Sequence, residues 1–417
     1  MKASLKAQEQ RLAYLMLLPP LLIVAAVVIF PVVANFWISF KPVGLADLRT
    51  PTPSVREPGN LDPAAGTVEV RYRLANRSGK LVIGDVVLRD TLAPGLTAPA
   101  DTGPCAVAEE DLTCRWDDWA PRYSERLTLV FAAQPAFFEA GIDLEESEPE
   151  MTGNAENPML SGGFTLDNYR RVLAQRDFVQ VLGVTVVYTV FGTLGALILG
   201  LFAALLLNQE FRGRTLLRGL FLFPYVSPVI AVAFTWVFFL DPFSGVLNAL
   251  GIHYGITETP LNFLGTESLT IDLFGLEFGF PLALATVIAF EAWRYFPLAF
   301  LFILARLQAL PSDLYEAASM DGATPLQKFR FITLPQLVGI LSILFMLRFI
   351  WTFNKFDDIF LMTGGAAGTR TLTVNVYEQG FALLNLGAGA AAAVITFGML
   401  AVFMVLYFIG MPKEEVS

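Results

Sequence analysis

The polar stretch EAASMDGATPLQKFRFITLP, from Glu316 to Pro335, separates two long apolar segments of the chain. Ser312 and Asp313 lie just before it and can cap a helix whose first turn holds Glu316. Gly322 predicts the end of this helix, because glycine readily adopts the left-handed conformation that stops a helix. The first half of the stretch therefore predicts a short helix that ends at a tight turn.

A second short helix is expected after this turn. Thr324 can cap it, and Pro325 suits its first position, where the N–H that proline lacks would have no helical partner. Leu334-Pro335 is expected to end it, just before the next apolar segment. Helices this short are marginally stable alone, so we expect a groove of a partner protein to hold them.

The rest of the sequence is typical of a membrane protein. Apolar residues make up 55% of the chain and charged residues only 16%, against about 25% charged residues in soluble domains. A helix needs about 20 apolar residues to cross the hydrocarbon core, and lipid cannot satisfy an open backbone. Six stretches are therefore predicted to be transmembrane helices: Leu12–Phe40, Val179–Leu207, Leu216–Leu240, Gly279–Ala305, Leu337–Met362 and Leu386–Met411. The first is too long for the core of a signal peptide and is expected to remain in the protein.

The basic residues predict the side of the membrane that each loop faces, because Lys and Arg concentrate in cytoplasmic loops. Basic residues lie before the first span, after the second and after the fourth, at Lys2, Lys6, Arg11, Arg212, Arg214, Arg218, Arg306, Lys328 and Arg330. Residues 241–280, between the third and fourth spans, contain no Lys or Arg. We therefore expect both termini and the stretch around Gly322 in the cytoplasm, and residues 41–160 outside.

Residues 41–160 are predicted to form a separate soluble insert. They hold 11 Lys or Arg against 20 Asp or Glu, and this difference of −9 is nearly the whole net charge of −10. The alternation of apolar and polar residues in TVEVRYRL predicts a strand, and LVIGDVVLRD and ERLTLVF predict two more. Short strands at this spacing indicate a β-sandwich over about residues 66–132. The acidic tail GIDLEESEPEMTGNAENPMLSGG is expected to be a linker back to the membrane.

The two cysteines, Cys105 and Cys114, both lie in this insert. An insert outside the cytoplasm is in an oxidising compartment, which favours a disulfide between them, with two free thiols as the alternative. The pieces VEVRYRLANRSG, VVLRDTLAPGLT and APRYSERLTLVF, with the cysteine pair, resemble the Ig-like repeats of bacterial surface proteins. That resemblance implies a fold and no particular activity.

The membrane part of the chain resembles the permease subunits of ATP-binding-cassette importers for carbohydrates. The motif that carries the resemblance is the EAA loop, here Glu316-Ala317-Ala318, Gly322 and, after nine further residues, Ile332, Leu334 and Pro335. Flanking pieces such as ALLLNQEFRGRTLLRGLFLFPYVSPVI and FDDIFLMTGG are similar as well. The resemblance covers Leu12–Phe40 and about residues 162–411, and it implies the type I importer fold. The predicted class is an all-α polytopic membrane protein with six transmembrane helices and an inserted periplasmic β-sandwich. Its predicted parts are residues 1–40, 41–160 and 161–417.

In that family the EAA loop couples the permease to an ATPase subunit, in whose cleft it lies. The resemblance implies this role within residues 312–335, for Glu316, Ala317, Ala318, Asp321, Gly322, Phe329, Ile332, Leu334 and Pro335. The chain lacks the G-x-x-x-x-G-K-[ST] loop that cradles ATP phosphates, so ATP and Mg are expected on two separate ATPase subunits. A second permease subunit, forming a heterodimer, and a periplasmic sugar-binding protein are the other expected partners. We expect no cofactor, metal or nucleic acid on this chain and no enzymatic activity of its own.

Ionisable residues inside membrane spans are costly and are candidates for a substrate pathway. Glu291 and Arg294 are three residues apart in the fourth span, so they share a helix face and can pair. The candidate pathway residues, some of them implied by the resemblance to maltose-type permeases, are Glu291, Arg294, Tyr295, Asn354, Lys355 and Asp357. A purely structural Glu291–Arg294 ion pair is the alternative, and Arg348 is expected to be structural.

These patterns predict the permease subunit of a sugar importer in the bacterial inner membrane, working by alternating access on a di- or oligosaccharide of maltose or α-glucoside type. One alternative is an ion-coupled secondary transporter that uses Glu291 as a proton site. Another is a permease for a solute other than a sugar. A third is a membrane-anchored adhesion protein whose working part is the insert, which leaves the EAA loop and five spans without a role.

Overall fold

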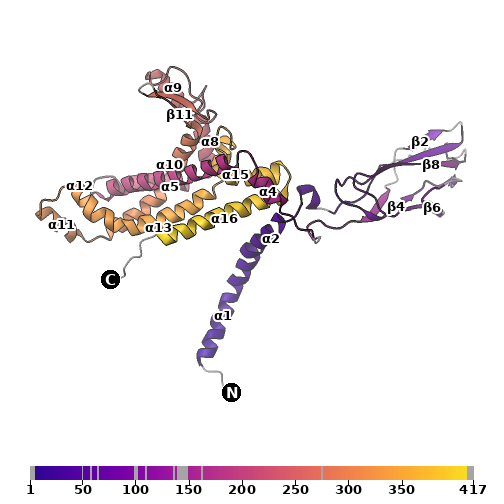
Figure 1. The fold of residues 1–417 in the computed structure, drawn as a ribbon, viewed down its shortest axis with the longest axis horizontal. Coiled ribbons are helices and arrows are strands. Elements are labelled where there is room, and N and C mark those ends of the chain that lie inside the picture. Colours follow the sequence, from indigo (N-terminus) through magenta and orange to yellow (C-terminus); the bar gives the residue numbers. More distant parts are fainter. Residues whose placement is uncertain are drawn as a thin grey trace. The chain divides into compact units, whose positions relative to one another are not determined.

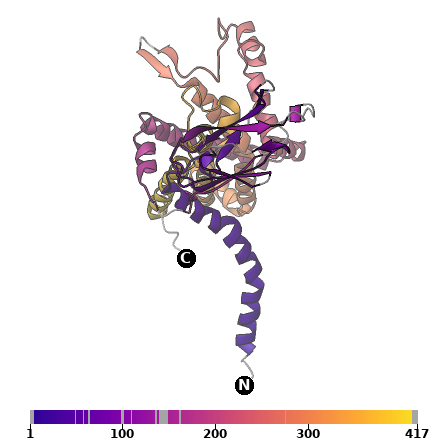
Figure 2. The same cartoon turned by 90° about the vertical axis from the view of Figure 1, so that its right-hand side faces the viewer.

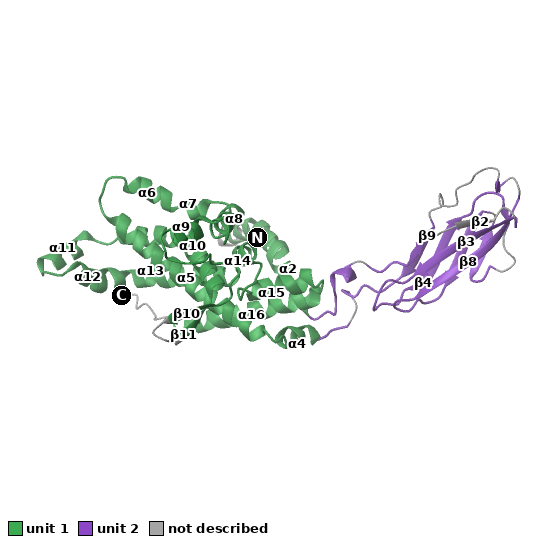
Figure 3. Ribbon diagram, turned by 90° about the horizontal axis from the view of Figure 1, so that it is seen from above, with its two compact units in different colours: residues 1–39, 166–417 green, residues 40–165 purple. Residues whose placement is uncertain are grey.

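The computed structural model describes residues 5–48, 50–56, 59–62, 65–97, 102–108, 110–134, 137–138, 149–160, 163–273 and 276–410. The chain divides into two compact units, residues 1–39 with 166–417 and residues 40–165 (Figure 3). The first unit is built mainly from helices and the second mainly from strands. The divisions lie within five residues of the boundaries predicted at residues 40 and 160.

Five long apolar helices of the first unit meet the length and hydropathy of a membrane span. They are Glu9–Ser39, Phe178–Asn208 (α5), Leu282–Gln308 (α10), Pro325–Phe353 and Leu386–Gly410 (α16). The first consists of α1 (Leu5–Val24), a π-turn (Ala25–Ile29) and α2 (Phe30–Ser39), which form one long helix in Figures 1 and 2. The α2 helix packs against α16, where the rings of Phe36 and Phe397 meet edge to face with centroids 6.2 Å apart. Five of the predicted spans are therefore present as long apolar helices.

The third predicted span is broken. The chain forms α6 (Arg214–Phe221), α7 (Phe223–Val226) and α8 (Val229–Phe239), and the segments on either side of the break are bent by 93°. The break lies at Ser227, whose backbone is extended, because the ring of Pro228 disfavours a helical conformation in the residue before it. The stretch Leu216–Leu240, predicted as a transmembrane helix, is therefore divided among three helices, and the expectation of one continuous helix is wrong.

The fifth predicted span ends earlier than expected. Its helix α13 (Leu334–Phe353) stops at Phe353, and the chain turns through Asn354 and Lys355 before the short α14 (Asp357–Thr363) begins. The prediction of a helix to Met362 is wrong because Met362 lies in this separate helix, beyond a polar turn. Further elements of this unit are α4 (Asp167–Leu173), α9 (Val246–His253), α11 (Ser312–Met320), α12 (Pro325–Lys328), α15 (Leu372–Tyr377), a π-turn (Glu378–Ala382) and the hairpin β10–β11 (Leu269–Leu273 and Leu276–Phe280).

Small residues let the long helices approach closely. On α5, a Cβ atom added to Gly200 would lie 2.6 Å from the Cβ of Ala299 on α10, and one added to Gly192 would lie 2.9 Å from the Cγ of Glu291. On α16, a Cβ atom added to Gly389 would lie 2.7 Å from the Cα of Gly380. Small residues of this kind let helices pack closely in a membrane protein. Glycines thus determine the spacing of the helices around the interior of the bundle.

The second unit contains two antiparallel sheets (Figure 3). The five-stranded sheet consists of β1 (Ser54–Arg56), β2 (Gly59–Asp62), β3 (Thr67–Ala75), β5 (Leu96–Thr97) and β8 (Ser124–Ala133). The four-stranded sheet has the order β6-β7-β4-β9, formed by Cys105–Ala108, Asp111–Trp116, Gly84–Thr91 and Glu150–Asn154. The three predicted strands are confirmed as β3, β4 and β8. Side chains from both sheets, among them Tyr72, Leu88 and Phe131, form one buried cluster.

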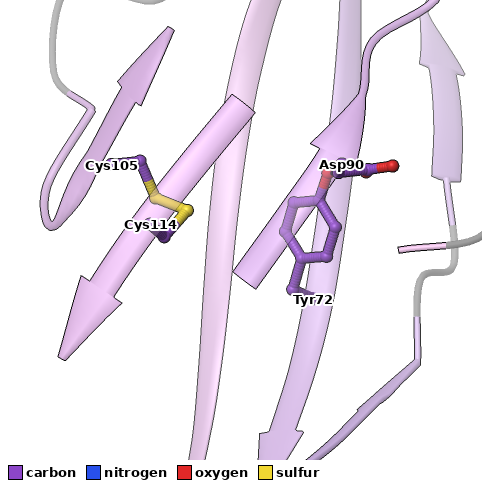
Figure 4. The surroundings of a disulfide bond; sticks show 4 residues. All are labelled: Tyr72, Asp90, Cys105 and Cys114. Atoms are coloured by element: carbon purple, nitrogen blue, oxygen red, sulfur yellow. A yellow bond between two sulfur atoms is a disulfide. The ribbon is translucent and has the colours of Figure 1, made fainter. Parts of the chain in front are cut away.

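The predicted disulfide is present between Cys105 on β6 and Cys114 on β7, which are direct partners in the strand register (Figure 4). Close to it, the buried hydroxyl of Tyr72 donates a hydrogen bond of 2.5 Å to the carboxylate of Asp90 (Figure 4). The bond joins β3 of one sheet to β4 of the other.

One prediction for this unit is wrong. The acidic tail was expected to be a linker throughout, yet Glu150–Asn154 forms β9, paired with β4. Met151 packs against the buried cluster, and a Cβ atom added to Gly153 would lie 2.6 Å from the side chain of Ile83. A single apolar residue and a close backbone approach therefore hold a segment whose composition is otherwise polar.

Candidate functional site

The stretch that carries the EAA motif folds as a hairpin of two short helices, α11 and α12 (residues 312–333 with the turns at its ends). It lies at one end of the helical unit (Figure 1). Gly322 has a backbone φ of +79°, in the left-handed region that favours glycine. The N–H groups of Gly322 and Ala323 donate to the carbonyls of Ser319 and Ala318, at 3.1 and 2.9 Å. The predicted helix stop at Gly322 is therefore confirmed.

The second helix of the hairpin is capped as the sequence predicts. The Thr324 hydroxyl accepts a hydrogen bond from the backbone N–H of Gln327 at 3.4 Å, and the Gln327 side chain accepts one from the N–H of Thr324 at 2.7 Å. This reciprocal pair is a capping box. The cap predicted for the first helix is wrong. Pro311 precedes the helix and no side chain caps it, because Ser312 is already its first helical residue.

The hairpin continues into α13 without a break. The α12 helix leads through a π-turn (Phe329–Thr333) directly into α13, so that Pro325–Phe353 is one apolar helix of 29 residues. The prediction that Leu334-Pro335 ends the helix is wrong. Pro335 lies within the first two positions of α13, immediately after the π-turn. At this position the absence of its N–H costs little. The second helix of the hairpin and this span therefore form one continuous helix.

Two side-chain hydrogen bonds brace the hairpin. The ammonium of Lys328 donates to the hydroxyl of Ser319 at 2.5 Å, and the hydroxyls of Tyr315 and Thr333 are 3.0 Å apart. Each bond joins α11 to the helix that follows it. The hairpin is therefore held as a unit by its own side chains.

The hairpin exposes apolar side chains. Met320, Leu326 and Phe331 are 89%, 74% and 71% exposed, whereas Phe329 and Ile332 are half-buried. Glu316, Ala317 and Asp321 are exposed, and Ala318 lines a depression together with Gln327 and Phe331. Sequence reasoning selected Phe329 and missed the three exposed residues. Their signal was the presence of large apolar residues beside a turn in an otherwise polar run.

A second constellation lies inside the bundle, the buried polar cluster of Tyr188, Glu291, Tyr295, Arg348, Thr352, Lys355 and Asp358. Glu291 of α10 forms an ion pair with Arg348 of α13, and both side chains are buried. The Glu291 carboxylate also accepts hydrogen bonds from the hydroxyls of Thr352 and Tyr188, at 2.9 and 3.0 Å. Buried charges are tolerated when they are paired and hydrogen-bonded in this way.

The predicted pairing of Glu291 with Arg294 is wrong. Arg294 donates instead to the carbonyls of Pro224 and Ser227, at 3.4 and 3.1 Å, where the third span breaks. The break leaves these carbonyls without helical N–H partners, and in lipid such groups need a donor from elsewhere in the bundle. Arg294 therefore holds the bend, and Arg348 neutralises Glu291.

Tyr295 connects the pair to a second group of charges. Its ring lies 4.2 Å from the guanidinium carbon of Arg348 and 4.5 Å from the ammonium of Lys355, and its hydroxyl contacts Lys355. Lys355 lies 3.3 Å from the carboxylate of Asp357 and 3.6 Å from that of Asp358. Asp358 is buried, whereas Asp357 is partly exposed.

Of the predicted pathway residues, Glu291, Tyr295 and Lys355 come together in the buried polar cluster, with Asp357 at its edge. Asn354 lies next to Lys355 but is exposed, and its amide donates to the carbonyl of Ile350 at 2.9 Å. Sequence reasoning missed Tyr188 and Thr352. A hydroxyl in the middle of a predicted span was the available signal for both.

Comparison with known proteins gives concordant matches. Residues 196–413 match the protein family described as binding-protein-dependent transport system inner membrane component. The inner membrane ABC transporter permease protein YcjO of Escherichia coli (strain K12) is 37% identical over 58% of this chain and 78% of its own length. The trehalose/maltose transport system permease protein MalF of Thermococcus litoralis is 34% identical over 67% of this chain and 88% of its own length. The sn-glycerol-3-phosphate transport system permease protein UgpA of Agrobacterium fabrum is 34% identical over 57% of this chain and 76% of its own length.

A solved structure shares the fold. A chain of a bacterial ABC transporter involved in the import of the acidic polysaccharide alginate superposes with a TM-score of 0.52 and 19% sequence identity, over 60% of this chain and 83% of that chain. The matched residues 196–413 include both the α11–α12 hairpin and most of the buried polar cluster, and they exclude residues 40–165.

Proposed function

The chain belongs to the family of binding-protein-dependent transport system inner membrane components, and on this premise we propose that it is the permease subunit of an ATP-driven sugar importer. The proposal assigns the coupling role to the α11–α12 hairpin and the substrate pathway to the region around the buried polar cluster. The ATPase activity would come from two separate subunits that bind ATP and Mg. A second, related permease would complete a heterodimer, and a soluble sugar-binding protein would deliver the substrate.

The observation that carries this proposal is the structure of the hairpin. It is stiffened by a capping box and by the Lys328–Ser319 hydrogen bond, and it exposes the apolar side chains of Leu326 and Phe331. Several large apolar side chains exposed on one short element favour a site for a partner protein. Glu316 is exposed on α11 and can pair with a basic group of that partner. The continuous helix from Pro325 to Phe353 then transmits the partner's movement to the membrane part.

The charges around the pathway favour a neutral substrate. Glu291, Asp357 and Asp358 outnumber Arg348 and Lys355, and each cation has a carboxylate partner within the cluster. A phosphate ester would need cations that are not already paired. A sugar offers hydroxyls to polar side chains and C–H faces to rings such as that of Tyr295. We therefore propose a di- or oligosaccharide of maltose, trehalose or α-glucoside type, as the name of the Thermococcus litoralis relative also favours.

The proposed topology follows the distribution of basic residues. Both termini and the α11–α12 hairpin would lie in the cytoplasm, and residues 40–165 would form a periplasmic β-sandwich. In the proposed cycle, ATP binding closes the ATPases, which displaces the hairpin and opens the pathway to the outside. Sugar enters from the docked binding protein, and hydrolysis restores the inward-facing state. ATP shifts the equilibrium between these states because its affinity for them differs.

The decisive experiment is transport by proteoliposomes that contain this chain, its partner permease and the ATPase, with the binding protein added outside. We expect ATP-dependent uptake of labelled maltose or trehalose, and no uptake of labelled glycerol 3-phosphate. Uptake driven by a proton gradient without the ATPase would support the secondary transporter instead. Replacement of Gly322 by Val should abolish uptake, because a β-branched residue is strained at a positive φ.

A further inference from the structure

Three arginines lie abreast on the five-stranded sheet of the second unit. Arg56 on β1 is the direct register partner of Arg73 on β3, and Arg73 is in turn the partner of Arg126 on β8. Partners in an antiparallel ladder point to the same face of the sheet, and neighbouring strands are about 5 Å apart. The three guanidinium groups therefore start from backbone positions spread over about 10 Å on one face.

This face is the outer one. Residues adjacent to the arginines along their strands, Val55, Leu74 and Leu127, belong to the buried cluster or pack against it. Side chains alternate between the two faces of a strand, so the arginines point away from this cluster. Arg56, Arg73 and Arg126 are all exposed. We define them as the arginine row.

The arginine row is costly for the fold by itself, because like charges placed directly opposite each other destabilise a sheet. Among the residues that the structure describes, none of the three arginines forms an ion pair. Elsewhere in this unit the opposite rule holds. Arg71 is paired with Glu69 at 2.7 Å, and Arg89 is the register partner of Glu150. The row therefore departs from the pairing of arginine with glutamate seen elsewhere in this unit. It does so although the insert has many more acidic than basic residues.

We propose that the arginine row is a docking surface for a soluble partner protein that presents carboxylate side chains. A guanidinium group binds a carboxylate through two parallel hydrogen bonds, and three such groups in line fit an extended acidic segment better than a single small anion. The partner's carboxylates would neutralise charges that the fold leaves uncompensated. This inference concerns residues outside the region of family similarity and does not depend on the transported substrate.

A membrane surface fits the row less well. Polybasic segments that bind anionic lipids hold about four to eight basic residues, and membrane-binding faces add large aromatic or aliphatic anchors. In the described part of the five-stranded sheet, Val130 is the large apolar residue that is exposed, and it is opposite Glu69 in the register. Among the described residues, the outer face thus has the three arginines of the row and Arg71, which Glu69 neutralises, but no aromatic anchor. This favours a protein partner over lipid.

The test uses the full-length chain in nanodiscs of zwitterionic lipid, with poly-L-glutamate as the probe in a binding assay at low salt. The triple variant Arg56→Gln/Arg73→Gln/Arg126→Gln should bind the probe about tenfold more weakly than the unchanged chain, because each exposed ion pair contributes modestly. Added salt should weaken binding by the unchanged chain, since the contacts are exposed. The matched control, Arg77→Gln/Arg89→Gln/Arg115→Gln, changes the net charge equally at exposed positions outside the row and should retain most of the binding.

Two further measurements make the outcome decisive. The triple variant should unfold at the same temperature as the unchanged chain or higher, because like-charge repulsion across the strands is removed. A clear drop in that temperature would assign the arginines a structural role and overturn the proposal. Equal losses of binding in the two triple variants would show that binding depends on net charge alone, and this would also overturn the proposal. Binding to vesicles of anionic phosphatidylglycerol but not to poly-L-glutamate would identify lipid as the partner instead.

Discussion

The α11–α12 hairpin and the buried polar cluster reverse the usual distribution of polarity in opposite ways. The hairpin exposes Leu326 and Phe331 to the surroundings, while the cluster buries Glu291, Arg348 and Asp358. Each cation of the cluster has a carboxylate partner within the chain, although the buried oxygens of Asp358 accept no hydrogen bond from the described residues. The exposed apolar side chains of the hairpin are not covered by other residues that the structure describes. The comparison shows that the cluster pairs its charges within the chain, whereas the hairpin carries the exposed apolar side chains that we propose a partner protein covers.

The largest expected effect tests whether the cluster is internally balanced. Replacement of Arg348 by Met leaves Glu291 as a buried charge without its partner, and we expect a loss of about 3–5 kcal/mol in the free energy of unfolding. Thermal unfolding of the purified chain in detergent measures this loss. The double variant Glu291→Gln/Arg348→Met removes both charges and should recover much of the stability. Equal instability of the single and double variants would contradict internal balance.

A smaller effect is expected where α5 makes room for the cluster. A Cβ atom added to Gly192 would lie 2.9 Å from the Cγ of Glu291. The variant Gly192→Ala should therefore lose about 1–3 kcal/mol by overpacking. Gly183 lies on the same helix with no heavy atom within 4 Å of such a Cβ. The control Gly183→Ala should be neutral or slightly stabilising, and the same detergent unfolding assay compares the two.

For the hairpin we expect the opposite result: a substitution should weaken binding of the partner protein without lowering the stability of the chain. The variant Phe331→Ser removes an exposed side chain, so we expect unchanged thermal unfolding and at least about tenfold weaker binding of the ATPase subunit. Surface plasmon resonance with the purified ATPase checks the affinity. Phe243 is 95% exposed in the segment after α8, and Phe243→Ser is the matched control that should bind normally. A stability loss without a loss of affinity would place Phe331 in the fold and not in the interface.

The smallest expected effect concerns the stiffness of the hairpin. The variant Thr324→Ala breaks the capping box with Gln327 and should cost about 1 kcal/mol locally. Hydrogen exchange of α12 amides should rise, while that of α10 should remain unchanged. Sugar uptake per ATP hydrolysed should fall, since a softer hairpin transmits less of the movement. Normal hydrogen exchange together with a normal ratio of uptake to ATP hydrolysis would show that the capping box is not needed for the stiffness or the function of the hairpin.

The hairpin could be predicted from the sequence more fully than the cluster, and the reason is physical. Gly322, Thr324 and Pro325 act on neighbouring residues, so their local signals determine the turn and the second helix. The partner of Glu291 could not be predicted in this way. The spacing favours Arg294 as the partner, but the Arg294 side chain donates to the Ser227 carbonyl at the break. The actual partner, Arg348, lies 57 residues after Glu291 on another helix.

The errors at element ends have similar causes. Pro335 was expected to stop a helix, yet the π-turn at Phe329–Thr333 accommodates it. The strand β9 was hidden in an acidic segment because, among its five residues, Met151 is the large apolar side chain that packs against the buried cluster. In both cases a tertiary contact or an uncommon backbone arrangement outweighed the local preference. Composition and spacing do not reveal such arrangements.

The unbroken helix from Pro325 to Phe353 joins the two compared regions mechanically. Arg348 lies 23 residues beyond Pro325 along it, a distance of about 35 Å at the rise of an α-helix. A tilt of about 10° at the hairpin end would swing Arg348 through about 6 Å if the rod stays straight. That is more than enough to pull it away from Glu291. The ion pair would then open in response to movement of a hairpin about 35 Å away along the same helix.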